Sequence, residues 1–318
     1  MTTRRDILKG AIAAAFLLRT EAGFAKPSQP STAVNFEMPN GACDCHTHIH
    51  GDPDKFPFFS GRIYTPDMAL PEEMAALHKA LRIQRVVIVT PSVYGTDNSA
   101  TLYGMKARGA DARGVAVIDD KTSDSELDAM GRLGVCGIRL NLATGGTSDP
   151  SVARQRFQVA AERMSKRNWH VQMYTSLAVI ASLKDTLAAS PVPVVFDHFG
   201  GARPELGPQQ PGFAALLELV RSGKAYVKIS VTAGPRLDYA DFEPLAKLLI
   251  SANPERMLWG TNWPHPNSAT PPGRKPTELT PVFDVDDGRV LNLLPQWAPE
   301  ATMRKRILVD NPAALYRF

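Results

Sequence analysis

The chain has 318 residues, of which 44% are hydrophobic and 21% are charged, and its formal net charge is +4. This composition is typical of a globular protein and excludes a mainly disordered chain. The first 25 residues hold two more basic than acidic side chains, which leaves only +2 for the remainder. So small a surplus gives no support for binding nucleic acid or a membrane surface.

The N-terminal segment, residues 1–25, has the pattern of a bacterial export signal. Arg4 and Arg5 precede a short apolar run at 10–18, and small residues precede a predicted cleavage after Ala25. We therefore predict a twin-arginine signal peptide and a periplasmic protein, with an amphipathic N-terminal helix as the alternative. The apolar run is shorter than the roughly 20 residues of a bilayer span, so we expect no stable membrane span.

The segment 26–40 is rich in proline, serine and asparagine and has no periodicity, so we expect a linker or a surface arm. We predict one folded domain over 41–318. Its cysteines, Cys43, Cys45 and Cys136, do not form a disulfide framework. We expect all three to be small buried apolar side chains.

Eight short apolar runs alternate with amphipathic segments along this domain. We predict strands at 42–50, 86–92, 114–119, 135–142, 170–175, 192–198, 226–230 and 257–263. We predict helices at 72–81, 102–108, 125–133, 152–166, 177–187, 213–222 and 242–250. Eight such β/α units predict an α/β protein with a distorted (β/α)8 TIM barrel, whose chemistry lies at the carboxyl ends of the strands. An open doubly wound sheet is the alternative, but no Gly-x-Gly-x-x-Gly follows the first strand.

The first strand carries alternating histidines. In DCHTHIH, Asp44, His46, His48 and His50 share one parity, so we expect their side chains to face the barrel interior together. The sixth strand ends at Asp-His, and we expect His198 to meet His46 and His48 at the barrel mouth. A hydrogen-bonded core histidine is the plainer interpretation of each one.

Other candidates lie at neighbouring strand ends. Arg139 and Asn141 share parity in GIRLN, where an inward guanidinium needs a carboxylate from the protein or from a ligand. Tyr174 ends the fifth strand and could donate a hydrogen bond. The loop after the second strand adds weaker candidates, which are Ser92, Tyr94, Thr96 and Asp97.

Six motifs occur in order along the chain: DCHTHIHG, YGTDN, GIRLN, DHFGG, LWGTNWPHP and NPAALY. Together they resemble the amidohydrolase superfamily, in the branch that contains 2-pyrone-4,6-dicarboxylate lactonase, sulfomuconolactone hydrolase and galactarolactone isomerase. The resemblance runs from about residue 41 to the C-terminus. It implies a distorted barrel that binds a small carboxylated lactone at the strand ends.

The resemblance also implies residue roles. His46, His48 and His198 would surround the lactone carbonyl and act with Asn262 as the catalytic group. The substrate-binding residues would be Tyr64, Ser92, Arg139, Tyr174, Arg236 and His265, with Arg139 and Arg236 holding carboxylate groups.

Asn262 departs from the family pattern, which has aspartate at this position. A neutral amide cannot take a proton from water, so Asp97, Asp119 or an imidazole would have to supply the base. His46, His48 and His198 could hold a zinc ion with a water molecule. We favour a site that needs no cofactor, in which the imidazoles act on the substrate directly.

The sequence thus predicts a hydrolase of a small carboxylated lactone. A lactone isomerase, which needs no activated water, is the second hypothesis, and a catalytically silent periplasmic acid-binding protein is the third. The identity of the lactone and the oligomeric state stay open.

Overall fold

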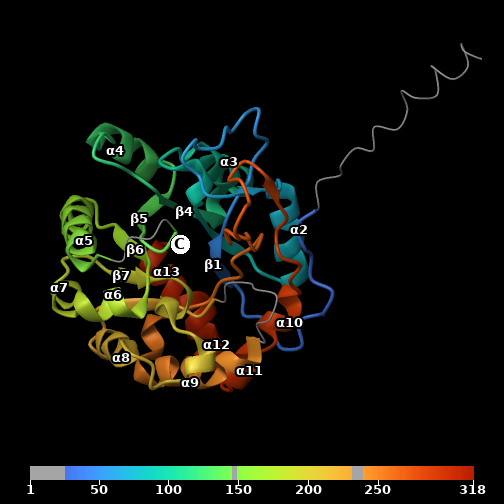
Figure 1. The fold of residues 1–318 in the computed structure, drawn as a ribbon. Helices are drawn as coiled ribbons and strands as arrows, with labels where there is room; N and C mark the ends of the chain where they lie inside the picture. The colour runs from blue at the N-terminus through green and yellow to red at the C-terminus, as the bar shows by residue number, and fades with distance from the viewer. Residues whose placement is uncertain (1–25, 145–148, 231–238) are drawn as a thin grey trace, which may run out of the picture.

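The structure is a computed structural model that describes residues 26–144, 149–230 and 239–318 (Figure 1). The predicted signal peptide at 1–25 and the predicted substrate ligand Arg236 lie outside the described residues. Across the described ranges, no helix is long and apolar enough to cross a membrane.

Eight parallel strands form one sheet whose order follows the chain. The strands are β1 (Cys43–Thr47), β3 (Arg85–Val89), β4 (Ala112–Ala116), β5 (Val135–Asn141), β6 (His170–Tyr174), β7 (Val194–Phe196), β8 (Ala225–Lys228) and β9 (Met257–Leu258). The segment after β9 returns to β1, where the amide of His48 donates to the carbonyl of Trp263 at 2.8 Å. This contact brings the two ends of the sheet together, so the predicted (β/α)8 barrel is confirmed.

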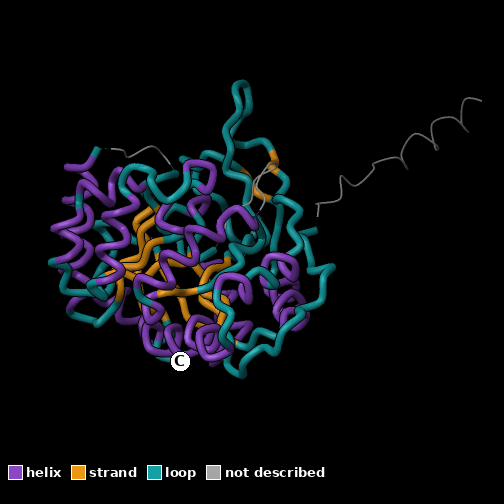
Figure 2. The backbone as a smooth tube through the Cα atoms, turned by 90° about the horizontal axis from the view of Figure 1, so that it is seen from below, coloured by secondary structure: helices purple, strands orange, loops and turns teal. Residues whose placement is uncertain are grey.

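Helices cover the outside of the barrel, as Figure 2 shows from below. They are α2 (Pro71–Leu81), α3 (Ser99–Arg108), α4 (Asp124–Arg132), α5 (Pro150–Ser165), α6 (Leu177–Ser182), α7 (Lys184–Ala188), α8 (Phe213–Arg221) and α9 (Glu243–Ala252). Four shorter helices follow, which are α10 (Asp287–Leu291), α11 (Leu294–Trp297), α12 (Ala301–Lys305) and α13 (Asn311–Tyr316). A small second sheet pairs β2 (Thr65–Pro66) with β10 (Leu279–Thr280).

Local sequence explains where several of these helices begin and end. Ser123 caps α4, because its side chain accepts from the amide of Glu126 while the Glu126 carboxylate accepts from the amide of Ser123. The single helix predicted over 177–187 is wrong, since Leu183 has φ −103° and ψ 4° and separates α6 from α7.

The lower part of the barrel interior is apolar. Side chains from six of the strands meet there and contact α13, which lies behind the barrel in Figure 1; they are Cys43, Cys45, Val87, Val89, Val115, Cys136, Val195 and Leu258, packed against Leu315 and Tyr316. All three cysteines are buried and free, as predicted. His170 packs against Tyr316 at this end, whereas the charged side chains of the interior lie toward the carboxyl ends of the strands.

Candidate active site

A bulge in β1 decides which of its polar side chains reach the interior. The pairing of β1 with β3 shifts register between Asp44 and Thr47, because a bulge adds a residue and changes the facing of the strand. Cys45 therefore faces the apolar floor together with Cys43. The predicted regular alternation along this strand is wrong.

Asp44 lies away from the interior for this reason, and His50 lies beyond the end of β1. The carboxylate of Asp44 contacts Nε2 of His78 on α2 at 3.2 Å and accepts from the hydroxyl of Thr261 at 2.6 Å. His50 pairs with Ala69 through the backbone, and its Nδ1 lies 3.2 Å from the carbonyl of Asp67. Both residues fix loops around the barrel instead of forming the site.

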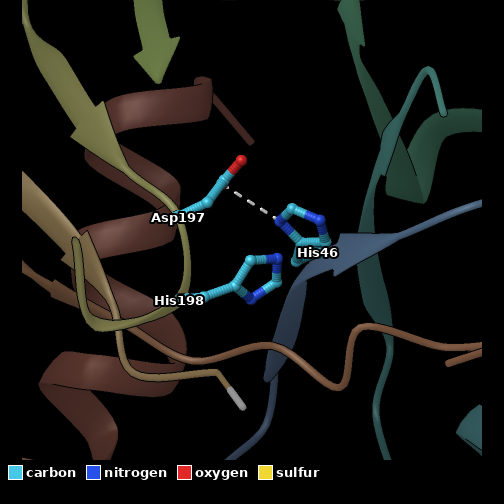
Figure 3. Close-up of side chains that lie close together, drawn as sticks. All are labelled: His46, Asp197 and His198. Carbon is cyan, nitrogen blue, oxygen red and sulfur yellow. Dashed lines mark ion pairs between the residues drawn. The ribbon is translucent and has the colours of Figure 1, made fainter. Parts of the chain in front are cut away.

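Asp197 is the centre of the buried polar network. Its carboxylate accepts from Nε of Arg139 at 2.9 Å and from Nε2 of Gln172 at 3.0 Å. Nδ1 of His46 lies 3.2 Å away and Nζ of Lys228 3.4 Å away. Burial alone would raise the pKa of this carboxyl, but the cations of Lys228 and Arg139 beside it hold it well below its usual value. Figure 3 shows Asp197 facing His46 from the opposite side of the interior.

His46 on β1 and His48, which follows the end of this strand, contact each other. Nε2 of His46 lies 3.3 Å from Nε2 of His48, and Nδ1 of His48 lies 2.7 Å from the carbonyl oxygen of Val89. Burial lowers the pKa of both imidazoles well below the usual value, with further lowering from Lys228 at His46 and from Arg139 at His48. Both rings are therefore neutral at neutral pH.

His198 follows β7 and turns back toward the barrel axis. Its φ of 49° and the glycines at 200 and 201 make this sharp turn. Gly201 has φ 77°, and a Cβ there would lie 2.5 Å from the carbonyl oxygen of Thr175, so the turn requires glycine. Nδ1 of His198 lies 2.9 Å from the hydroxyl of Ser230, and burial lowers the pKa of this imidazole to about 4.

A cavity of about 380 Å³ lies at the carboxyl ends of the strands. Eight predicted candidate residues line it: His48, Tyr64, Ser92, Arg139, Asn141, Tyr174, His198 and Asn262. Its other lining residues are Pro91, Thr144, Pro266, Asn267, Ser268, Ala269 and Phe283. In this described lining, Arg139 is the only lysine, arginine, aspartate or glutamate.

His46 and His265 do not line the cavity. His46 is fully buried behind the lining, between Asp197 and His48. Nε2 of His265 lies 3.0 Å from the carboxylate of Asp287, and burial raises the pKa of that carboxyl. Both imidazoles are buried outside the lining of this cavity.

Arg139 presents its terminal nitrogens to the cavity. Only its Nε is bound to the described part of the chain, through Asp197. The guanidinium carbon lies 4.9 Å from the ring centre of Tyr174, a cation–π contact that fixes the plane of the group. The two terminal nitrogens can therefore bind an anion in the bidentate manner that arginine favours.

Asn262 lies on the loop after β9 and is held on both sides. Its backbone amide donates to the backbone carbonyl of His46 at 2.8 Å, and its backbone carbonyl accepts from the backbone amide of His265 at 2.8 Å. Its φ is 66°, a left-handed conformation that asparagine and aspartate tolerate better than most residues. The side chain lines the cavity as a neutral hydrogen-bonding group.

The carboxylates considered as bases in place of Asn262 lie elsewhere. Asp97 accepts from the amide of Ser99 at 2.8 Å, and Asp119 accepts from the amides of Lys121 and Thr122 within its own turn. Neither residue lines the cavity. An imidazole is therefore the only general base that the described lining offers.

Sequence reasoning missed two residues of the network, Gln172 and Lys228. Both lie on strands in otherwise apolar runs, and both are fully buried. A lone lysine at the end of an apolar strand is itself a signal, because an ammonium group is buried only with partners. The sequence places Asp197 at the end of a strand. Its central position in the network depends on side chains from five strands that meet in the barrel interior, which local sequence does not show.

Three side chains of the network form a group that could hold a metal ion. Ligand atoms of His46, Asp197 and His198 lie within 4.8 Å of one another, a group that replaces His48 of the predicted set with Asp197. Asp197 already faces two cations, Arg139 and Lys228. A divalent ion added here would meet two positive charges against one carboxylate, which opposes its binding.

Comparisons with known proteins agree with the fold. The amidohydrolase family profile matches residues 43–318. The chain is 33% identical over 305 residues to a 2-pyrone-4,6-dicarboxylate hydrolase of Comamonas testosteroni, covering 92% of this chain and 94% of that protein. It is 29% identical over 291 residues to a D-galactarolactone isomerase of Agrobacterium fabrum, covering 90% and 94%. A crystal structure of a putative 2-pyrone-4,6-dicarboxylic acid hydrolase from Pseudomonas putida superposes with a TM-score of 0.72 at 28% identity, covering 88% of this chain and 98% of that one.

Proposed function

The chain belongs to the amidohydrolase family, and we propose that it hydrolyses a small lactone that carries a carboxylate group. The observation that carries this proposal is that Arg139 and His198 line the same cavity. One provides a fixed cation with two unused terminal nitrogens, and the other provides a neutral imidazole. The sequence of residues 1–25 supports a periplasmic location, reached by the twin-arginine route.

Charge in the buried network favours an anionic substrate. Arg139 and Lys228 bring two positive charges to one carboxylate, that of Asp197, while the histidines beside them are neutral. Among the described residues, the network therefore has one unbalanced positive charge next to the cavity. In a poorly solvated site this charge stabilises a substrate carboxylate and also the oxyanion that forms during hydrolysis.

We infer that the substrate carboxylate binds to the terminal nitrogens of Arg139. The hydroxyls of Tyr64 and Tyr174 are protonated at neutral pH, since burial raises both pKa values, that of Tyr64 to about 12. These hydroxyls and the side-chain amide of Asn262 are donors that can bind a lactone carbonyl oxygen. The charge that develops on this oxygen is stabilised by such prearranged donors.

His198 then transfers the proton of the attacking water. Its neutral imidazole takes a proton from water at Nε2 as the water oxygen bonds to the carbonyl carbon, and Ser230 stabilises the imidazolium by accepting from Nδ1. The bond between the carbonyl carbon and the ring oxygen breaks. His198 returns the proton to that oxygen, so the product is the open-chain hydroxy acid and the enzyme is unchanged. No step requires a metal ion.

Turnover of a panel of carboxylated lactones tests the proposal. We expect loss of the lactone with formation of the open-chain acid, and a fall of 10²-fold or more in kcat for His198→Gln, in the range of general acid–base catalysis. The same panel includes lactones without a carboxylate as a control. Equal turnover of lactones with and without the carboxylate would contradict the role of Arg139, and no turnover at all would favour an acid-binding protein.

Lactone isomerisation is the second candidate, because Asn262 is an amide and the described cavity lining has no carboxylate. In this reaction a hydroxyl of the substrate replaces water, and His198 moves its proton in the same way. An amide is sufficient to orient a hydroxyl. Product analysis separates the two reactions, since isomerisation yields a second lactone and hydrolysis yields an open-chain acid.

A further inference from the structure

Lys228 is a buried cation that does not line the cavity. It lies at the end of β8 and has no exposed surface. Its ammonium group donates to Oε1 of Gln172 at 2.7 Å, lies 3.2 Å from Nδ1 of His46 and forms an ion pair with Asp197 at 3.4 Å. An ammonium group has N–H donors and no acceptor. Its position therefore determines what the neighbouring imidazole can do.

The hydrogen bond of His48 to the backbone determines which of its ring nitrogens carries the proton. This in turn determines which ring nitrogen of His46 carries one. A carbonyl oxygen only accepts, so Nδ1 of His48, at 2.7 Å from Val89, carries the proton. Nε2 of a neutral His48 is then an acceptor, and the facing Nε2 of His46 at 3.3 Å must donate to it. A neutral His46 protonated at Nε2 has an acceptor at Nδ1. Lys228 is the donor that this atom requires.

Asp197 offers the competing arrangement. Its Oδ1 lies 3.2 Å from Nδ1 of His46 and accepts no well-aligned hydrogen bond from the described residues. A carboxylate in this place would draw a proton to Nδ1 of His46. With Lys228 present, that proton would point toward a cation at 3.2 Å, which is unfavourable.

We propose that Lys228 is a positioning residue that fixes one tautomer in each of two histidines, with the proton on Nε2 of His46 and on Nδ1 of His48. The proposal rests on the proposed function for its consequence. Every ring nitrogen of the two histidines is then engaged within the protein. Proton transfer with the substrate is left to His198, whose Nε2 has no hydrogen bond to the described residues.

The other charged and titratable groups around Lys228, His46 and His48 are consistent with these proton positions. Asp197, His198 and Lys228 face His46, whereas Arg139 and Cys45 also face Lys228. His198 is bound through Nδ1 to Ser230, so it does not compete for the proton of His46. None of these groups supplies a second donor to Nδ1 of His46.

The test is nuclear magnetic resonance of the protein labelled with nitrogen-15 in its histidines, which reports which ring nitrogen carries each proton. The signals are assigned by their loss in His46→Gln and His48→Gln. We expect Nε2–H at His46 and Nδ1–H at His48. In Lys228→Met, Nδ1 of His46 loses its donor, and we expect a proton to appear there, facing Asp197.

Two variants complete the design. Lys228→Arg keeps a cation with N–H donors and should retain the wild-type protonation of His46. Lys184→Met removes an exposed lysine that pairs with Glu218 and should change nothing. The proposal is overturned if wild-type His46 carries its proton on Nδ1, or if Lys228→Met leaves the signals of His46 unchanged. If Lys228→Met does not fold, the wild-type spectrum alone decides. No lactone is needed, so failure here is distinct from failure of the proposed function.

Discussion

Replacement of Arg139 tests how the cavity recognises its substrate. Arg139→Met keeps an unbranched side chain of similar reach but removes the guanidinium, and with it the two terminal nitrogens that face the cavity. A hydrogen bond to a charged group contributes about 1.5–3 kcal/mol. At 1.36 kcal/mol per factor of ten, we expect kcat/KM to fall by about 10- to 150-fold, mainly through a higher KM.

The substitution also removes a partner of Asp197, so folding must be measured alongside kinetics. Gln172 and Lys228 still contact that carboxylate, and we expect a folded protein with reduced stability. Steady-state kinetics on a carboxylated lactone, with circular dichroism, provide both measurements. Arg132→Met, at an exposed arginine in the last turn of α4, is the matched control. An unchanged KM in folded Arg139→Met would refute the carboxylate clamp.

Three further predictions follow from the same geometry. Asn262→Asp keeps a side chain suited to φ 66° and adds a carboxylate at the cavity, so product analysis should show new or faster hydrolysis; unchanged hydrolysis would remove Asn262 from the account of the base. The free energy of unfolding should fall as the pH drops from about 6.5 to 4. Burial lowers the pKa of His50 and of His198 to about 4 and of His170 to about 3 in the folded protein. The unfolded chain therefore binds more protons than the folded protein in this range. Urea unfolding should show a slope of about 1.4 kcal/mol per pH unit for each such histidine, and a flat profile would contradict their buried neutral state. Activity should survive treatment with a chelator, whereas its loss, with recovery on adding zinc, would show that a metal is bound despite the charges of Arg139 and Lys228.

Periodicity was sufficient to predict the barrel, because each strand and most helices are amphipathic or apolar at the expected spacing. The last strand shows the limit of this reasoning. The prediction extends this strand to residue 263, but the strand ends at Leu258. Residues 259–263 bend so that Asn262 lines the cavity. A bend of this kind depends on contacts with β1, such as the bond between the amide of Asn262 and the carbonyl of His46, which periodicity does not report.

The site was predicted best where side chains lie at regular strand ends. Arg139, Tyr174 and His198 line the cavity as expected. The sequence predicts that His46 contacts the substrate, but its side chain lies behind the cavity lining. Alternation along a strand predicts which face of the sheet a side chain occupies, but not how far from the barrel mouth it lies. The bulge that removes Asp44 from the interior depends on pairing with another strand. Lys228 acts through partners on three other strands or their ends, which no local pattern shows.

The reaction of a carboxylated lactone in water enriched in oxygen-18 distinguishes hydrolysis from isomerisation. We expect loss of the lactone and an open-chain acid whose new carboxylate contains the label, since water attacks the carbonyl carbon next to His198. The same experiment with His198→Gln should give little product. An unlabelled, rearranged lactone would contradict hydrolysis and establish the isomerase reaction, and a lactone that is bound but never consumed would contradict catalysis at this cavity.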